Sequence, residues 1–216
     1  MIDFHIHSVF SDGELIPAEI IRRAEEIGYK ALAITDHADP SNLDLIIPRI
    51  VKVFKEIQAY TSVALLPGVE LTHVPPESIS ELAKEAKKLG AKIIVVHGET
   101  IVEPVKKGTN KAAIEADIDI LAHPGLISEE EVKEAAARGI YLEISSRKGH
   151  SLSNGHVAKL AIKHGAKLVI NTDTHSPSDL ISEDYACKIL KGAGLSDLEI
   201  KEVFKNMEEI IRRKNK

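Results

Sequence analysis

Residues Asp3–Gly13 read DFHIHSVFSDG. Apolar and polar residues alternate at the start of this stretch, which is the period of a short β-strand, so His5 and His7 share one face about 6 to 7 Å apart. A serine-rich turn follows, and Gly13 helps to close it. Asp12 therefore returns towards the end of the strand as a third potential ligand of one ion. Taken alone, an HxH pair is equally typical of an ordinary surface strand.

The composition indicates an ordinary globular chain. It has 216 residues, a single cysteine and a net charge of −5, which argues against a large basic surface for a nucleic-acid backbone. There is no apolar run of about 18 residues and no basic leader before the first strand pattern. Cys187 lies in a helical run, where we expect an inert thiol in a reducing compartment. We therefore expect one domain over residues 1–216, located in the cytoplasm.

Seven apolar runs, each followed by a helical pattern, give the chain a regular alternation without a linker. Such alternation indicates a parallel sheet, and seven units in one rhythm favour closure into an α/β barrel. A doubly wound open sheet is the alternative. The C-terminal helical segment, at about 196–214, is expected to pack on the barrel. The strands are predicted at 2–7, 31–35, 63–66, 92–96, 118–122, 140–144 and 167–170, and the helices at 17–27, 43–60, 77–89, 110–116, 129–138, 157–163, 177–190 and 196–213.

Histidines and carboxylates recur where these apolar runs end. In a parallel barrel the C-terminal ends of all strands meet at one rim, and catalytic groups gather there. Any one of these side chains could be an ordinary structural residue, but together they predict a metal cluster. The set consists of His5, His7, Asp36, His37, Glu70, His97, His123, Asp173 and His175.

At HIHSVFSDG, ITDH, GVE, VVHGE, LAHPG and NTDTHS the chain resembles the polymerase and histidinol phosphatase (PHP) superfamily, in order from Asp3 to about Pro177. The resemblance implies a distorted seven-stranded (β/α)7 TIM-like barrel that holds two or three divalent metal ions. It also implies which residues bind each ion. These are His5, His7, Glu70 and Asp173 for the first ion, Glu70, His97 and His123 for the second, and Asp12, His37 and His175 for the third.

The residue types suit phosphoryl chemistry. A carboxylate such as Glu70 can bridge two cations and offset their repulsion, and two neighbouring ions lower the pKa of a shared water to give a bridging hydroxide. The mixed nitrogen and oxygen set accommodates Zn, Mn or Fe. Glu70, Asp173 and His175 are the predicted catalytic residues. Asp36 is expected either to orient a ligating imidazole or to cap the next helix.

Basic residues follow the strand at 140–144 and face the same rim. Arg147, Lys148 and His150 are the predicted substrate-binding residues, with Arg147 offering the best fork for a phosphate. A solvated basic loop is the plainer interpretation. Three further residues come near the rim without an assigned role, namely His73, Glu99 and His156.

Three functions are compatible with these observations. The first is a metal-dependent phosphoesterase that hydrolyses a small phosphomonoester, with histidinol phosphate as one candidate. The second is a 3′ to 5′ nuclease, because LEISS and KLVINTDTHSPSDL also resemble the PHP module of some DNA polymerases, although no basic groove with interleaved aromatics is evident. The third is a non-catalytic scaffold, which the intact ligand set argues against, since buried carboxylates and imidazoles without metal are costly.

Overall fold

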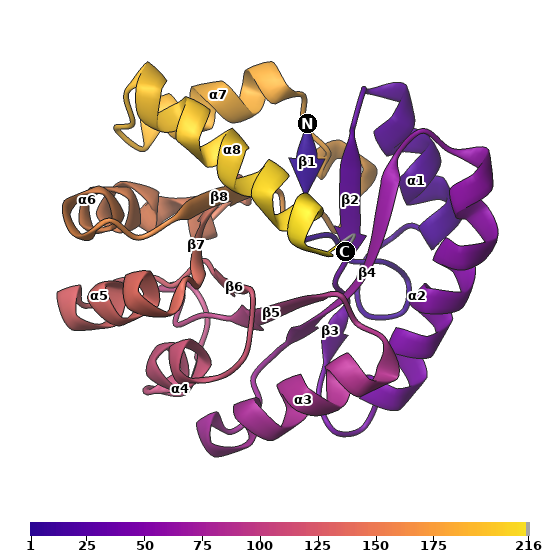
Figure 1. Cartoon of the computed structure of the whole chain (residues 1–216), viewed down its shortest axis with the longest axis horizontal. Coiled ribbons are helices and arrows are strands. Elements are labelled where there is room, and N and C mark those ends of the chain that lie inside the picture. Colours follow the sequence, from indigo (N-terminus) through magenta and orange to yellow (C-terminus); the bar gives the residue numbers. More distant parts are fainter. Residues whose placement is uncertain (215–216) are drawn as a thin grey trace.

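Seven parallel strands form a nearly closed barrel in the computed structural model, which describes residues 1–214 (Figure 1). Each strand pairs with the next along the path β1-β2-β4-β5-β6-β7-β8, and the two-residue strand β3 pairs with the end of β4. The predicted (β/α)7 TIM-like barrel is therefore confirmed. The strands are β1 (Ile2–Asp3), β2 (Ala31–Ile34), β3 (His37–Ala38), β4 (Ala64–Leu71), β5 (Ile93–His97), β6 (Ile120–Ala122), β7 (Tyr141–Ser145) and β8 (Leu168–Asn171).

The barrel closes between the first and last strands, just beyond the ends of β1 and β8. The backbone N–H of His7 donates to Thr174 O at 2.8 Å, and the N–H of Thr174 donates to His5 O at 3.3 Å. Side chains continue the seam, because Asn171 Oδ1 accepts from the N–H of Phe4 at 2.9 Å. The alternative of an open sheet, whose edge strands would remain apart, is wrong.

The strands are buried on both faces, which explains their continuous apolar runs. All five residues of β5 are buried, and so are all four of β2. Helices surround the barrel and supply the outer layer of the core (Figure 1). They are α1 (Pro17–Glu26), α2 (Leu43–Ile57), α3 (Ile79–Leu89), α4 (Thr109–Glu115), α5 (Glu129–Arg138), α6 (Asn154–His164), α7 (Glu183–Gly192) and α8 (Asp197–Lys214), with short 3₁₀ helices at Gln58–Tyr60, Pro76–Ser78, His150–Ser153 and Pro177–Asp179.

Local sequence signals set several helix ends. Ser128 caps α5 in a capping box, since its side chain accepts from Glu131 N while the Glu131 carboxylate accepts from the N–H of Ser128. Gly139 ends the same helix in the left-handed conformation that glycine adopts without strain. The predicted helix at 177–190 is wrong as a continuous element. It breaks after Asp179, and α7 starts afresh where Ser182 Oγ accepts from Tyr185 N at 3.3 Å.

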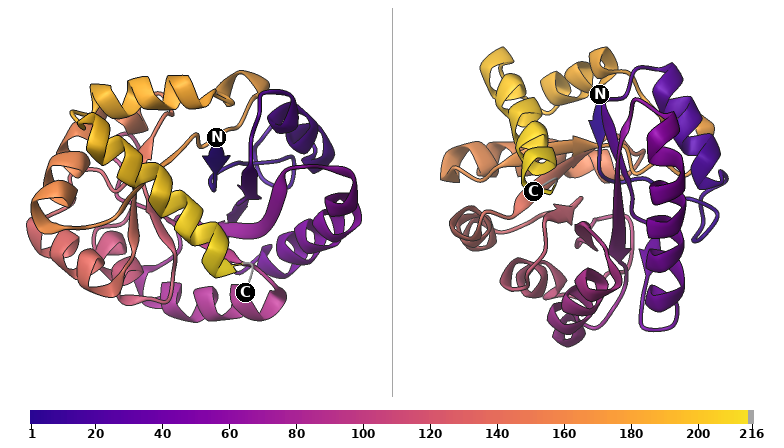
Figure 2. Two further views of the ribbon diagram at one scale, coloured as in Figure 1. Left: turned by 45° about the horizontal axis from the view of Figure 1, so that its top comes forward. Right: turned by 45° about the vertical axis from the view of Figure 1, so that its right-hand side comes forward.

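Helix α8 lies across the N-terminal end of the barrel, shown in yellow in Figures 1 and 2. Asn206 Nδ2 donates to Leu168 O at 2.9 Å, where β8 begins, and Lys167 Nζ lies 2.6 Å from Glu209 Oε2. The opposite end, where the strands terminate, is the end that carries the predicted ligands.

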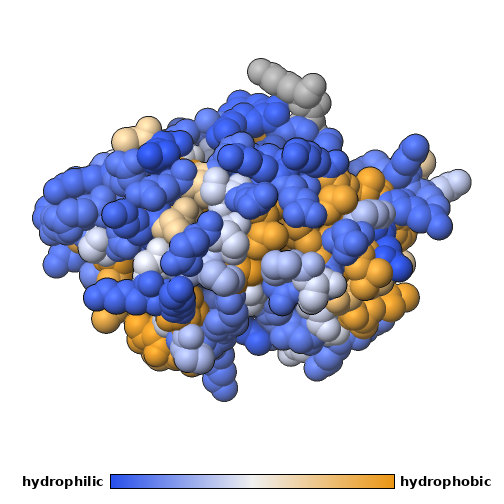
Figure 3. All heavy atoms as spheres, turned by 90° about the horizontal axis from the view of Figure 1, so that it is seen from below, coloured by the Kyte–Doolittle hydropathy of each residue, from blue (hydrophilic) through white to orange (hydrophobic). Residues whose placement is uncertain are grey.

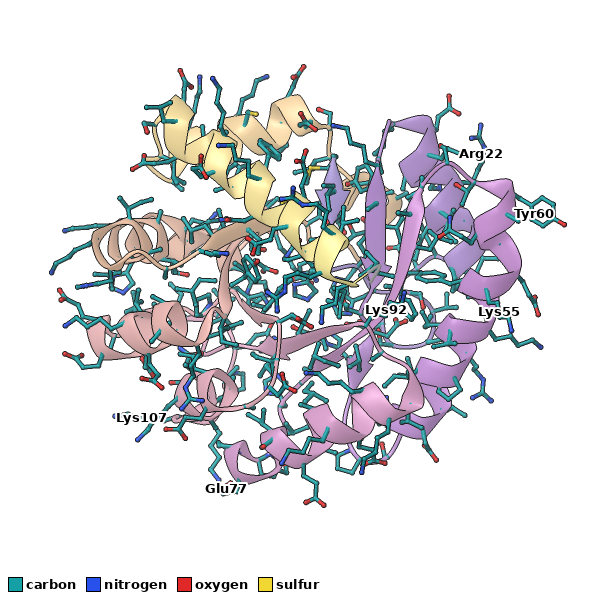
Figure 4. The ribbon with its side chains drawn as sticks, in the orientation of Figure 1. Arg22, Lys55, Tyr60, Glu77, Lys92 and Lys107 are labelled. Carbon is teal, nitrogen blue, oxygen red and sulfur yellow. The ribbon has the colours of Figure 1, made fainter. Side chains whose placement is uncertain are left out.

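The outer surface is largely hydrophilic. Figure 3 shows one face on which polar side chains dominate and hydrophobic areas are separated from one another. In Figure 4 the labelled side chains of Arg22, Lys55 and Tyr60 point outward from the helical layer. Within residues 1–214, no helix combines the length and the apolar character that crossing a membrane requires.

Candidate metal centre

A cavity of about 380 Å³ opens at the C-terminal end of the barrel. The side chains at the ends of β4, β5, β6 and β8 converge below it, and side chains crowd the centre of the barrel in Figure 4. The segment just after β1 contributes both imidazoles of the HxH pair, with ring centroids 5.0 Å apart. The residues that line the cavity are Asp12, His37, Ala38, Asp39, Asn42, Thr72, His73, His97, Glu103, Arg147, His150, Asp173 and His175.

The deepest group of side chains comes from the segment after β1, from β4 and from the segments after β6 and β8. His5 Nε2 lies 3.1 Å from Glu70 Oε1, and His7 Nε2 lies 3.2 Å from Asp173 Oδ1. His123 Nε2 is 3.7 Å from Glu70 Oε1 and 3.8 Å from Asp173 Oδ2. All five side chains are buried. Donor atoms from distant parts of the chain are thus spaced as the ligands of shared ions are.

A second group lies nearer to the mouth. Asp12 Oδ1 is 3.1 Å from His175 Nε2 and 3.5 Å from His37 Nε2. The ring of His7 lies 4.1 Å from that of His37 and 4.2 Å from that of His175, measured between centroids. His7 therefore belongs geometrically to both groups.

All nine predicted ligands come together at this end of the barrel, in overlapping sets of three or four whose donor atoms lie within 4.8 Å of one another. The sets differ in detail from the grouping that the PHP resemblance implied, because Asp173 is grouped with His5 and His123. Four sets together contain all nine predicted ligands, and His97 also belongs to a fifth set with His73 and Glu103. The four sets are His5, His7 and Glu70; His5, His123 and Asp173; Glu70, His97 and His123; and His7, Asp12, His37 and His175.

The chemistry of the donor set fits bound cations. Within the described residues, His5 Nε2, Glu70 Oε1 and both ring nitrogens of His7 are buried without a hydrogen-bond partner. Unpaired buried polar atoms are costly, and a cation that accepts their lone pairs would satisfy them. Burial lowers the pKa of His7 and of His123 well below its usual value, so both are neutral imidazoles, the form that binds metals.

The carboxyl groups carry opposite pKa shifts. Burial alone would raise the pKa of Glu70, but the neighbouring His5, His37 and His97 outweigh it and hold this pKa well below its usual value. Burial raises the pKa of Asp173 to about 7, with the Glu70 carboxylate adding to the rise and His5 opposing it. Two carboxylates so close together need positive charge between them, which a divalent ion supplies.

Glu143 supports the deepest group from behind. It lies fully buried on β7, and its Oε2 accepts from His5 Nδ1 at 2.8 Å and from Asn171 Nδ2 at 2.9 Å. Donation from Nδ1 holds the ring of His5 with Nε2 facing Glu70, where a bound cation would take the place of a proton on Nε2. Burial opposes protonation of His5, but the carboxylates of Glu143, Glu70 and Asp173 raise its pKa well above the usual value. Sequence reasoning assigned Glu143 no role, although a lone charge in an apolar strand was a usable signal.

Asp36 performs neither of its two predicted roles. Its Oδ1 accepts from Ser8 N at 2.6 Å and from Ser11 Oγ at 2.8 Å, and its Oδ2 accepts from Ser8 Oγ at 2.7 Å. The buried carboxylate therefore fixes the turn that carries Asp12. No sequence pattern predicted that the serines of the turn bind Asp36, because Asp36 follows a different strand.

The predicted substrate-binding residues separate in the structure. Arg147 lines the cavity, and its Nη1 donates to Asp173 O at 3.0 Å. His150 also lines the cavity, but burial lowers its pKa to about 4, so it is a neutral imidazole at physiological pH. Lys148 is not among the residues that line the cavity.

The three residues without an assigned role differ as well. His156 Nε2 lies 2.7 Å from Ile127 O, and Glu99 Oε1 accepts from Gly108 N at 2.9 Å, so both hold loops. His73 lines the cavity. Among the described residues, the non-glycine residues with positive φ are His73 at 54°, His123 at 25° and Asp173 at 53°, and all three belong to this end of the barrel. Strained backbone of this kind concentrates at functional sites.

Fold and site together define a TIM-like (β/α)7 barrel with a cavity rich in imidazole and carboxylate side chains. The chain matches the family described as RNase P subunit p30 over residues 1–216, and it belongs to that family. It is 52% identical over 200 residues to an uncharacterized protein of Methanocaldococcus jannaschii, covering 92% of each chain. It is 30% identical over 220 residues to a probable phosphatase of Thermoanaerobacter sp. (strain X514), covering 91% of this chain and 88% of the relative.

Solved structures share the fold. The chain superposes on a protein in the structure of archaeal ribonuclease P with mature tRNA, with a TM-score of 0.75, 19% identity and coverage of 100% of this chain and 91% of the other. A histidinol phosphate phosphatase from Lactococcus lactis, complexed with zinc, L-histidinol and phosphate, gives a TM-score of 0.57 at 16% identity, covering 97% of this chain and 93% of the other. At these identities the likeness concerns the fold alone.

Proposed function

We propose that the protein is a metal-dependent phosphoesterase that hydrolyses a small phosphomonoester. The observation that carries the proposal is the convergence of buried, unpaired donor atoms, above all His5 Nε2 and Glu70 Oε1, beneath a cavity of about 380 Å³. A cavity of that size lies within the range of small-molecule sites. Relatives named probable phosphatases, one of them 30% identical over most of the chain, support the same reading.

The residues that would hold the ions are the nine side chains identified from the sequence. Divalent ions bound there would stabilise the charge on phosphoryl oxygens and bring the pKa of a water near neutrality. Zn, Mn and Fe all suit this mixture of imidazole and carboxylate, in two or three positions. The set consists of His5, His7, Asp12, His37, Glu70, His97, His123, Asp173 and His175.

Other contacts prepare the site for a phosphate. Arg147 is one-third exposed, and its Nε lies 3.5 Å from Asp173 Oδ2, so its planar fork borders the cavity beside the buried ligands. Asp173 lines the same cavity and would accept the proton of an attacking water. His150 contributes a neutral imidazole. Thr100 Oγ1 lies 2.7 Å from its Nδ1 and fixes the orientation of the ring. Arg147 therefore orients the anion, while Asp173 handles the proton.

The test is phosphate release by the purified protein after metal removal and separate reloading with Zn, Mn or Fe. The substrates are an aryl phosphate, L-histidinol phosphate and a panel of sugar and nucleoside monophosphates. We expect release that depends on added metal and falls at least 100-fold in Glu70→Gln, with Glu81→Gln on the outer face of α3 as the matched control. Protein that demonstrably binds metal and yet cleaves no member of the panel would refute the proposal.

A second candidate is a role in RNA processing, as a protein subunit or as a nuclease. It is favoured by the RNase P subunit p30 family and by the superposition on an archaeal ribonuclease P protein over the whole chain. Binding of labelled precursor tRNA and of RNase P RNA, compared at low and high salt, would test the subunit role. Degradation of labelled single strands in the presence of metal would test the nuclease. Tight RNA binding that survives Glu70→Gln would identify a scaffold independent of the metal centre.

A further inference from the structure

Glu103 lies among three imidazoles, and no sequence pattern indicated this position for it. Its Oε2 lies 3.0 Å from His97 Nε2 and 3.4 Å from His73 Nε2, while its Oε1 lies 3.4 Å from His150 Nε2. The three imidazoles come from separate parts of the chain, since His73 follows β4, His97 is the last residue of β5 and His150 begins the 3₁₀ helix after β7. Glu103 is one-third exposed and lines the mouth of the cavity. A carboxylate is thus held where it faces both the buried ligands and the entrance.

The loop that carries Glu103 is closed at its base. Glu99 Oε1 accepts from Gly108 N at 2.9 Å and from Asn110 N at 3.0 Å, and Asn110 Oδ1 accepts from Glu99 N at 2.9 Å. Asn110 Nδ2 also donates to Pro124 O at 2.9 Å, which ties the loop to the segment after β6. This clamp fixes the two ends of the loop, so the direction of Glu103 into the cavity is built into the fold.

His73 reaches the cluster at a cost to its backbone. Its φ of 54° lies in the left-handed region, where a non-glycine residue is strained. The same conformation occurs at His123 and Asp173, which are both in the predicted ligand set. A strained backbone that places an imidazole 5.0 Å from the ring of His97, between centroids, points to a use for that imidazole.

The geometry limits what His97 can bind. Its Nδ1 lies 3.2 Å from Gly98 O and donates there, which leaves Nε2 as the single coordinating atom. An ion bound by His97 Nε2 would therefore lie next to Glu103, whose carboxylate faces the same nitrogen and belongs to one set with His97 and His73. Ligands of a tetrahedral zinc, at about 2.0 to 2.1 Å from the metal, are about 3.3 Å from one another. The separations of 3.0 and 3.4 Å around Glu103 Oε2 match that edge.

We propose that Glu103 and His73 are additional ligands of the ion that His97 Nε2 would bind, with Glu103 supplying an anionic ligand from the mouth of the cavity. This inference rests on the metal centre of the proposed function. Because Glu103 lines the mouth of the cavity, its carboxylate would compete with an incoming phosphate oxygen for that ion. The loop would thereby tune both the affinity for that ion and the access of the substrate.

Metal affinity tests the inference without reference to catalysis. Metal-free wild type, Glu103→Gln and His73→Asn are titrated with Zn²⁺ against a chromogenic chelator, and the Co²⁺ forms are compared by their visible absorption. Asparagine tolerates the left-handed conformation, so His73→Asn removes the imidazole without adding strain. We expect Glu103→Gln to weaken the binding of one ion at least tenfold and to change the intensity of the Co²⁺ absorption bands. The changes in His73→Asn should be smaller.

The control is Glu81→Gln, an exposed change on α3 that removes the same charge far from the cavity. Circular dichroism and thermal unfolding establish that each variant is folded, and Glu103→Asp replaces Glu103→Gln if the latter is not. Unchanged affinities and Co²⁺ spectra in both cavity variants would overturn the inference while leaving the metal centre intact. Failure of the wild type to bind any metal would instead refute the proposed function.

Discussion

Asn171→Ala should destabilise the protein strongly, because this side chain links the closing seam of the barrel to the metal centre. Asn171 is fully buried at the end of β8. Its Oδ1 accepts from the N–H of Phe4, and its Nδ2 donates to Glu143 Oε2, both at 2.9 Å. Alanine would leave the Phe4 N–H buried without a partner and would remove a donor from a buried carboxylate.

The magnitude follows from those two bonds. A buried donor left unpaired costs about 1 to 3 kcal/mol, and a hydrogen bond to a charged group contributes about 1.5 to 3 kcal/mol. We therefore expect a loss of about 3 to 5 kcal/mol from the free energy of unfolding, a large share of the roughly 5 to 15 kcal/mol that folded domains have.

The assay is urea denaturation followed by circular dichroism in the presence of EDTA, so that bound metal does not mask the loss. Asn206→Ala is the matched control, because Asn206 is only partly buried and makes a single hydrogen bond, to Leu168 O at 2.9 Å. Asn206→Ala should lower the free energy of unfolding by about 1 kcal/mol. If Asn171→Ala were no more destabilising than Asn206→Ala, the account of the seam would be wrong.

Three further perturbations address the site and its loops. Glu143→Gln, which removes the carboxylate behind His5 Nδ1, should weaken metal binding about 10- to 100-fold in a chelator competition titration; equal affinities would remove Glu143 from the site. Gly125→Ala should cost about 2 to 4 kcal/mol in urea denaturation, because φ is +61° and the new Cβ would lie 1.9 Å from Glu99 O, whereas Gly192→Ala, with open space around it, should be neutral or stabilising. Chelation of bound metal should lower Tm by about 8 to 16 °C in differential scanning calorimetry, for ions held at 1,000 times their Kd; an unchanged Tm would argue against a metal centre that stabilises the fold.

The order and type of the elements could be predicted because each strand is a short apolar run and each helix has its own boundary signals. The helix Glu129–Arg138 was predicted with its bounds and its cap, since Ser128 and Gly139 are local signals. The first strand was predicted too long. It ends at Asp3, and beyond it Ile6 forms an isolated bridge to Thr174 after β8 and accepts from the N–H of Thr35 after β2. No local pattern contains that partner.

The site divides in the same way. Side chains at strand ends could be located from the sequence, because a parallel barrel brings all of those ends to one rim. Glu103 could not be located, since it lies in a loop without periodicity whose path is set by hydrogen bonds between Glu99 and Asn110. Asp36 was placed at the rim, but its serine partners depend on contacts across two strands. Long-range hydrogen bonds, rather than local preferences, decide these roles.

The seam between the first and last strands also determines when the pocket can exist during synthesis. The imidazoles of His5 and His7 leave the ribosome first, while Asp173, which lies 3.2 Å from His7 Nε2 in the folded protein, follows only after about 165 more residues. At ordinary translation rates that interval is roughly 8 to 33 s. During that interval a nascent chain carries only part of the candidate metal centre, and a cation bound to it would have to be exchanged or retained until the barrel closes.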